Sequence, residues 1–428
     1  MKLNYGRTFF VGLAFLSICA FWQMYDNIIP LMLKNTFHLN ETVTGAVMAM
    51  DNVLALFMLP LFGAFSDKVN TPLGKRTPFI LTGTLLAVLS MTILPIAEKN
   101  ANFTLFFIFL AIVLIAMGSY RSPTVALMPD ITPKPLRSKA NAVINLMGAV
   151  GVIYTLIMIK VFFKGPDPNR YTKLFLSVSF LMLLAVIILL FTIKEKKLAS
   201  QIDDTEQEPV KQKVNTGNVK EFMGMPEDVR RSFFFILASI FLWFFAYNAV
   251  TTAYTRYAEV VWKLKTGGFA NSLIVATIAA IFSYIPIGNI ASRIGRKKTI
   301  MGGIIMMTSA YLCGAFFIHY SAWVNVIFAV TGIGWAAINV NSYPMIVEMC
   351  KGSDVGKYTG IYYMFSMSAQ IITPIVSGAL LQYVSYRTLF PYAVVFSFAS
   401  FGTMLFVKHG DSRPEKKKDV LENFDAED

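Results

Sequence analysis

The stretch GAFSDKVNTPLGKRTPFI (residues 63–80) places one acidic and three basic side chains between two long apolar runs. The whole chain of 428 residues is 55% hydrophobic and only 15% charged, which is too apolar for a soluble protein of this size. In lipid, only helices and closed barrels satisfy every backbone hydrogen bond. The apolar runs are continuous rather than alternating, so the sequence predicts an all-α membrane protein.

Working outward from this loop, the apolar runs define twelve candidate spans of about 20 residues or more. They cover residues 8–33, 43–65, 78–97, 102–127, 140–163, 171–193, 231–256, 269–289, 299–319, 322–346, 358–383 and 388–408.

An even number of spans puts both termini on one side of the membrane. With the N-terminus inside, 27 of the 38 Lys and Arg residues fall on the inner side and 10 on the outer side, while Arg121 lies within a span. This bias predicts a multi-pass protein of the cell (plasma) membrane with both termini in the cytoplasm. The net charge of +13 is then a signal of topology and of attraction to the lipid bilayer, and it requires no nucleic-acid partner.

A related loop, GNIASRIGRKKTI (residues 288–300), lies between spans eight and nine, 225 residues after the first. This spacing is about half the chain, which predicts two six-helix halves related by duplication. We expect an N-terminal half at 1–193, a flexible cytoplasmic linker at 194–230, a C-terminal half at 231–408 and a cytoplasmic tail at 409–428.

Glycines at helix ends let neighbouring helices approach closely, and charges beside them can form pairs that hold a seam shut in one state. We therefore expect the two loops to control gating. The expected gating residues are Gly63, Asp67, Lys68, Gly74, Lys75 and Arg76 in the first loop, and Gly288, Arg293, Gly295, Arg296 and Lys297 in the second.

Twelve spans and these paired loops resemble the major facilitator superfamily, although Ser292 stands where the superfamily pattern has Asp. The longer first loop and the segment YRSPTVALMPDITPKPLRSKANA (residues 120–142) are similar to the sucrose and glycoside cation symporter branch, to which plant sucrose transporter-like proteins belong. The resemblance implies a bacterial member of that branch, working by alternating access around a cavity lined by spans one, four, seven and ten.

Ionisable side chains deep in a span are costly and indicate function. Asp26 in span one and Asp51 in span two lie at similar depth, so they are candidates for binding a coupling ion. Arg121 in span four is a candidate counter-charge for them, or a hydrogen-bond donor to a sugar hydroxyl. Melibiose-type sodium relatives, as the resemblance aligns them, carry carboxylates where this chain has Ala55 and Leu59. This difference favours a proton, and a sodium site built from Asp26, Asp51 and backbone oxygens stays open.

A sugar needs aromatic faces for its ring and polar groups for its hydroxyls. Polar and aromatic residues that interrupt the spans are therefore candidate substrate-binding residues. They are Trp22, Gln23, Tyr25, Arg121, Tyr247, Asn248, Trp335, Asn339 and Gln370.

Other functional classes fit less well. The chain contains none of HExxH, GxSxG or a clustered Cys and His set, so we expect no enzyme, cofactor or metal site. A proton-coupled exporter of drugs or metabolites is an alternative, but span five lacks the Gly-Pro pair often seen in exporters of the superfamily. A non-transporting membrane receptor is a remote alternative. The sequence thus predicts a monomeric proton-coupled symporter of a sugar, either a disaccharide or a glycoside.

Overall fold

Twelve long α-helices make up the computed structural model, which describes residues 4–132, 137–165, 167–200, 227–264, 267–349 and 355–411. Their bounds are α1 (Tyr5–Asn35), α2 (Glu41–Lys68), α3 (Thr77–Lys99), α4 (Phe103–Asp130), α5 (Arg137–Phe162), α6 (Arg170–Thr192), α9 (Glu227–Val260), α10 (Phe269–Ile294), α11 (Arg296–Phe316), α12 (Trp323–Glu348), α13 (Val355–Tyr383) and α14 (Leu389–Leu405). A short helix α7 (Glu195–Ala199) follows α6, and a 3₁₀ turn η3 (Tyr386–Thr388) precedes α14.

The helices confirm the predicted fold class, because each predicted span coincides with one of them. Among the described residues, eleven helices are long and apolar enough to cross a membrane, and the apolar part of α10 (Phe269–Tyr284) is shorter. The described part of the chain contains no β-strand, only an isolated bridge between Thr71 and Gly74.

Local sequence sets where several helices begin. Asn4, Asn40 and Asn102 precede α1, α2 and α4, and each side-chain oxygen accepts a hydrogen bond from the backbone N–H three residues further on, at 2.8–3.0 Å. These caps satisfy backbone donors that a helix leaves unpaired at its first turn. The apolar runs therefore become helices with defined starting points.

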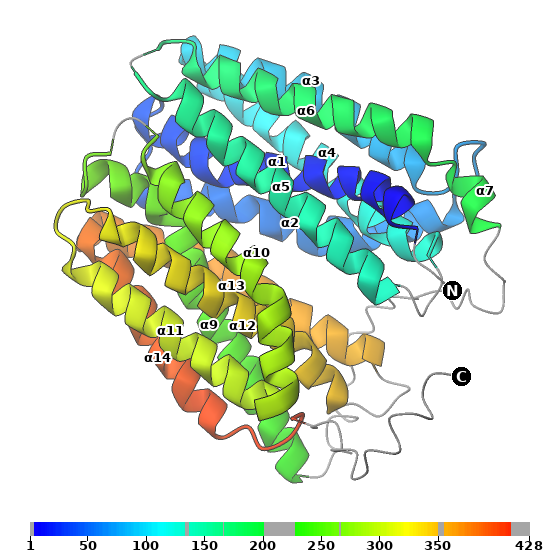
Figure 1. Cartoon of the computed structure of the whole chain (residues 1–428). Coiled ribbons are helices and arrows are strands. Elements are labelled where there is room, and N and C mark those ends of the chain that lie inside the picture. The colour runs from blue at the N-terminus through cyan, green and yellow to red at the C-terminus, as the bar shows by residue number, and fades with distance from the viewer. Residues whose placement is uncertain are drawn as a thin grey trace, which may run out of the picture.

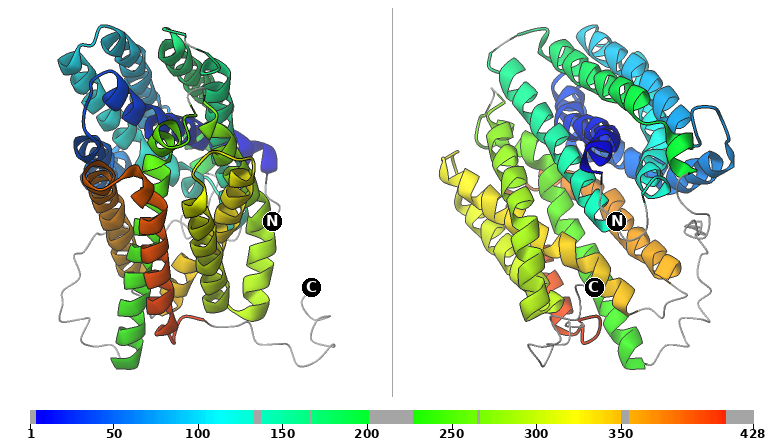
Figure 2. Two further views of the ribbon diagram at one scale, coloured as in Figure 1. Left: turned by 90° about the vertical axis from the view of Figure 1, so that its left-hand side faces the viewer. Right: turned by 45° about the vertical axis from the view of Figure 1, so that its right-hand side comes forward.

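The helices form two groups, one made of α1–α6 and the other of α9–α14 (Figures 1 and 2). Contacts between the groups run mainly between α2 and α13, between α5 and α10, and between α1 and α9. Most of the predicted linker, residues 201–226, and residues 412–428 of the predicted tail lie outside the described residues. The duplication of two halves stays a prediction.

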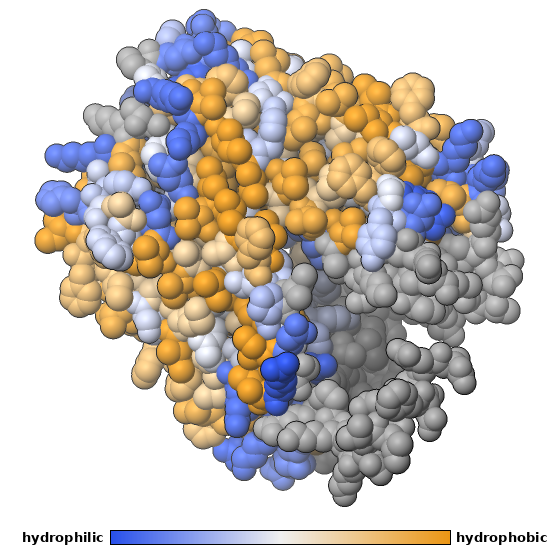
Figure 3. All heavy atoms as spheres, in the orientation of Figure 1, coloured by the Kyte–Doolittle hydropathy of each residue, from blue (hydrophilic) through white to orange (hydrophobic). Residues whose placement is uncertain are grey.

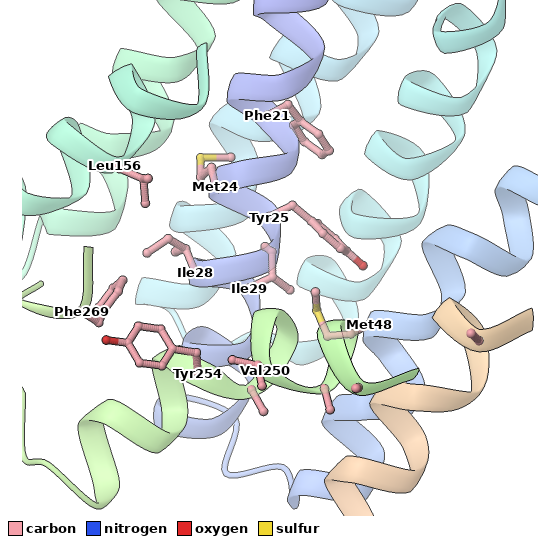
Figure 4. Close-up of a cluster of buried hydrophobic side chains, with 14 of the residues drawn as sticks. Phe21, Met24, Tyr25, Ile28, Ile29, Met48, Leu156, Val250, Tyr254 and Phe269 are labelled. Carbon is pink, nitrogen blue, oxygen red and sulfur yellow. The ribbon is translucent and has the colours of Figure 1, made fainter. Parts of the chain in front are cut away.

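Helix α1 carries much of the core between the groups. Phe21, Met24, Tyr25, Ile28 and Ile29 of α1 are buried. Figure 4 shows them beside buried side chains of α2, α5, α9 and α10. Because α1 contacts helices of both groups, side chains along it lie at the boundary between the groups.

The groups touch closely at the end opposite the two termini, which we call the far end. A Cβ at Gly45 of α2 would overlap the carbonyl oxygen of Pro374 in α13, and a Cβ at Gly378 of α13 would lie 2.5 Å from the carbonyl oxygen of Glu41. Toward the end that carries both termini, which we call the termini end, the groups diverge (Figure 1), and the surface is hollowed between them (Figure 3).

The close packing of α2 on α13 generates a prediction. Gly45→Ala should force these helices apart, because the new methyl group meets backbone rather than a movable side chain. We expect a lower melting temperature for the purified protein. Gly402→Ala is the matched control, since a Cβ at Gly402 of α14 meets open space. Equal melting temperatures for the two variants would contradict this account of the far end.

Candidate functional site

Three ionisable side chains that the sequence singled out lie on neighbouring helices of the first group, α1, α2 and α4. Asp26 of α1, Asp51 of α2 and Arg121 of α4 are each partly exposed, and they lie within electrostatic range of one another. The Asn52 amide donates a hydrogen bond to Asp51 Oδ1 at 2.8 Å. We call Asp26, Asp51 and Arg121 the charged triad.

The aromatic residues of α1 flank this triad. The Arg121 guanidinium lies over the Trp22 ring at 5.5 Å, and Trp22 meets the Tyr25 ring edge-on at 5.4 Å. Trp22 Nε1 and the Tyr25 hydroxyl are buried, and neither has a hydrogen-bond partner within the described residues. Unpaired buried donors are costly, so these two atoms are available to a bound molecule or to water.

The second group contributes neutral side chains. The rings of Tyr247 (α9) and Trp335 (α12) stack with centroids 3.8 Å apart and planes at 4°. Asn339 (α12) is exposed and lies near Tyr284 of α10. Helix α9, which carries Tyr247, contacts α1, which carries Asp26 and Trp22, so the neutral face of the second group lies beside the helix that carries part of the triad.

For two of the predicted substrate-binding residues, the observed hydrogen bonds run within their own helices. Gln370 Nε2 donates to the Ser366 carbonyl of its own helix at 3.3 Å. The Gln23 backbone carbonyl accepts a hydrogen bond from Asn27 Nδ2 at 2.8 Å. Conversely, Tyr284 of α10 and Tyr363 of α13 were not singled out from the sequence, although they lie near Asn339 and Arg121 respectively.

The first of the two predicted gating loops is organised by Arg76. Its guanidinium donates to Asp67 Oδ1 at 2.5 Å and to Asp130 Oδ2 at 2.7 Å, and it also contacts Ser66. These partners all belong to the first group. The charge pairs expected across the seam are therefore not seen for Asp67 and Arg76 in this conformation, and Lys68 is exposed.

The glycines of the loops behave differently from one another. A Cβ at Gly63 would lie 2.9 Å from Ser122 Oγ, which agrees with the expected close approach, whereas a Cβ at Gly288 meets open space. Arg293, which follows in α10, is exposed. Gly74 (φ 119°) and Gly295 (φ 99°) occupy conformations that other residues rarely adopt, so glycine is required there for a conformational reason.

A carboxylate caps the helix after each of these two glycines. Glu195 of α7 accepts hydrogen bonds from the backbone N–H groups of Lys75, Arg76 and Thr77 at 2.7–3.1 Å, at the start of α3. Asp411, after α14, accepts from the N–H groups of Arg296 and Lys297 at 2.5 and 3.2 Å, at the start of α11.

Both caps place negative charge where backbone donors and the helix dipole favour it. Glu195 lies within the segment predicted as a flexible linker, yet its side chain is buried. Sequence reasoning missed both caps.

A second missed feature closes the far end. The Glu41 carboxylate at the start of α2 pairs with Arg256 Nε of α9 at 2.8 Å and with Lys34 Nζ at 3.1 Å, and it accepts a hydrogen bond from Tyr386. The Asn35 amide lies 3.3 Å from both carboxylate oxygens of Glu259. We call Lys34, Glu41, Arg256 and Tyr386 the outer seal.

No group of three or more His, Cys, Asp and Glu side chains that could hold a metal ion occurs in the described part of the chain. Cys19 and Cys313 are free, and Cys350 lies outside the described residues.

The sequence profile of the Major Facilitator Superfamily matches residues 11–283 and 258–424. The chain belongs to this superfamily. It is therefore a multi-pass membrane transporter of a small molecule rather than an enzyme. No curated protein sequence matches the chain.

Solved structures with the same fold include several superfamily transporters of low sequence identity. A mutant form of the nucleoside transporter NupG is 15% identical with a TM-score of 0.69, over 93% of this chain and 99% of its own. A POT family transporter in complex with 5-aminolevulinic acid is 12% identical with a TM-score of 0.71, over 94% and 95%. The xylose transporter XylE from E. coli, in an inward open conformation, is 15% identical with a TM-score of 0.66, over 99% and 98%.

The cap on α3 generates a prediction. In Glu195→Gln the negative charge is lost, so the backbone N–H groups of residues 75–77 should be held less tightly. Hydrogen–deuterium exchange of the peptide covering residues 69–77 should become faster than in wild type. Glu227→Gln changes an exposed carboxylate at the start of α9 and serves as the control. Unchanged exchange in Glu195→Gln would show that the cap does not hold this loop.

Proposed function

We propose that this transporter is a proton-coupled symporter of a neutral sugar, either a disaccharide or a glycoside, in the plasma membrane. The proposal depends on one observation: a charged triad in the first group lies near a neutral aromatic and amide face in the second. The triad supplies a group that can bind a cation, and the neutral face supplies contacts suited to an uncharged ring.

The charge balance of the triad supports a proton. Two carboxylates and one guanidinium leave one net negative charge at membrane depth, and binding one proton removes it. A sodium ion would need several oxygen ligands. Ala55 and Leu59, one and two turns further along α2 from Asp51, offer only hydrocarbon. A sodium-coupled glycoside symporter is thus the less favoured alternative.

The neutral face supports a sugar. The stacked Tyr247–Trp335 pair presents an aromatic surface, and Asn339, one turn after Trp335, provides an amide group on the same face of α12. Asn248 follows Tyr247 in α9. The proteins of similar fold named for xylose and nucleoside transport handle ring compounds of this kind, and their likeness is compatible with the proposal. A similar fold is also seen in peptide transporters, so the substrate class has to be tested directly.

The shape of the molecule supports alternating access. The outer seal joins the groups at the far end, while the hollow opens toward the termini end (Figure 3). With both termini in the cytoplasm, this arrangement is an inward-facing state. The first gating loop, whose charge pairs stay within one group here, would be free to meet the second group when the inner side closes.

The coupling ion can be tested in vesicles that contain the purified protein. Uptake of labelled mono- and disaccharides should follow an imposed proton gradient at fixed membrane potential and ignore a sodium gradient. Asp26→Asn should lose accumulation against a gradient, because the remaining carboxylate of Asp51 is already balanced by Arg121 and the triad no longer carries a net negative charge for a proton to remove. Accumulation that follows sodium alone would refute proton coupling, and accumulation retained in Asp26→Asn would remove Asp26 from the mechanism.

The place of the site can be tested by calorimetry with the best-transported sugar. Trp22→Ala removes an aromatic face beside the triad, and Arg121→Ala removes its cation, so each should weaken binding at least tenfold without loss of folded protein. Trp323→Ala is the control, since Trp323 at the start of α12 is 70% exposed. Affinities equal to wild type in both site variants would place the site elsewhere.

A further inference from the structure

The polar contacts of the outer seal differ in whether they cross from one group of helices to the other. Glu41 pairs with Arg256 of the second group at 2.8 Å and with Lys34 of its own group at 3.1 Å. Tyr386, from the second group, hydrogen-bonds to both Glu41 and Lys34. If the groups part at the far end, Glu41 therefore loses Arg256 and Tyr386 but keeps Lys34.

Arg256 has no second carboxylate among its observed partners. It is 1% exposed, and its Nη1 is buried without a hydrogen-bond partner among the described residues. A guanidinium can engage carboxylate oxygens through several donors, so this atom is available to a further oxygen. A buried charge without a partner is strongly unfavourable. A second carboxylate within reach of Arg256 would therefore lower the cost of opening while water enters.

Glu259 is the carboxylate that can take this place. It follows Arg256 by three residues on α9, and side chains at this spacing are neighbours on the surface of a helix. In the observed conformation its two oxygens instead lie 3.3 Å from the Asn35 amide of the first group. It also lines a small cavity together with Arg170 of the first group. Opening of the far end would remove both neighbours and leave Glu259 free to bind Arg256.

We propose that the far end opens by an exchange of ion-pair partners, in which Arg256 passes from Glu41 to Glu259. Glu41 keeps its pair with Lys34 during this exchange. Each carboxylate then has a cationic partner of its own group when the seam is open, so no charge of the exchange is left unpaired. The inference rests on the alternating access of the proposed function, and it does not depend on which ion or substrate is carried.

The exchange and a purely structural role of Glu259 predict different effects of Glu259→Gln. The Gln side chain keeps an oxygen that can accept from Asn35, but it has no charge to attract Arg256. If Glu259 only holds the groups together, the variant leaves the far end unchanged or opens it. If Glu259 receives Arg256 in the open state, the variant disfavours that state and closes the far end.

The test measures distances across the far end in the purified full chain, by electron paramagnetic resonance of two spin labels. The labels are attached at Thr104→Cys in α4 and His319→Cys between α11 and α12, two exposed positions, after the three natural cysteines are replaced by alanine. Asn35→Ala removes the bond across the seam and keeps Glu259, so it should raise the ratio of open to closed molecules. Adding Glu259→Gln to this chain should lower that ratio about threefold, the effect of one partly buried charge pair.

Glu98→Gln, added to Asn35→Ala in the same way, is the matched control. Glu98 of α3 is a half-buried carboxylate whose hydrogen bond comes from Thr36 of the same group, so its loss should leave the ratio unchanged. A ratio that Glu259→Gln leaves unchanged or raises would overturn the exchange and leave the proposed function intact. A single distance in every variant would overturn alternating access and the exchange with it. Because no substrate enters the measurement, a failure of sugar or proton coupling in vesicles would leave the exchange standing.

Discussion

The ion pair between Glu41 and Arg256 is the interaction on which the observed conformation depends. The two residues are 6% and 1% exposed, and they come from different groups of helices. Separating the two charges of a buried ion pair is strongly unfavourable unless water solvates both of them. The groups can therefore part at the far end only if water enters between Glu41 and Arg256. While they are joined, the groups can diverge only toward the termini end, which is where the hollow lies.

Charge is distributed unequally between the two groups at membrane depth. The first group carries Asp26, Asp51 and Arg121, whereas the second presents Tyr247, Asn248, Trp335 and Asn339. The proposed function therefore assigns ion binding to the first group of helices and ring recognition to the second. A substrate lying between them contacts both, so its presence and the protonation of the triad can influence the same movement.

The elements of the fold could be predicted because lipid imposes a continuous apolar run on every span, and such runs are local features of the sequence. The members of the triad could be singled out for the same reason, since Asp26 stands out against an apolar background, and their role stays a prediction. The outer seal and the caps could not. Glu195 contacts Lys75 over 120 residues, and Glu41 contacts Tyr386 over 345. Next to a loop, such carboxylates look like ordinary solvated charges until the fold supplies their partners.

The position of Asp411 has a practical meaning for protein engineering. This carboxylate accepts hydrogen bonds from the first turn of α11, so residues that follow the last helix still take part in the packed structure. A reporter or affinity tag fused directly after Val407 would delete the anchor, whereas a junction beyond Asp411 would retain it.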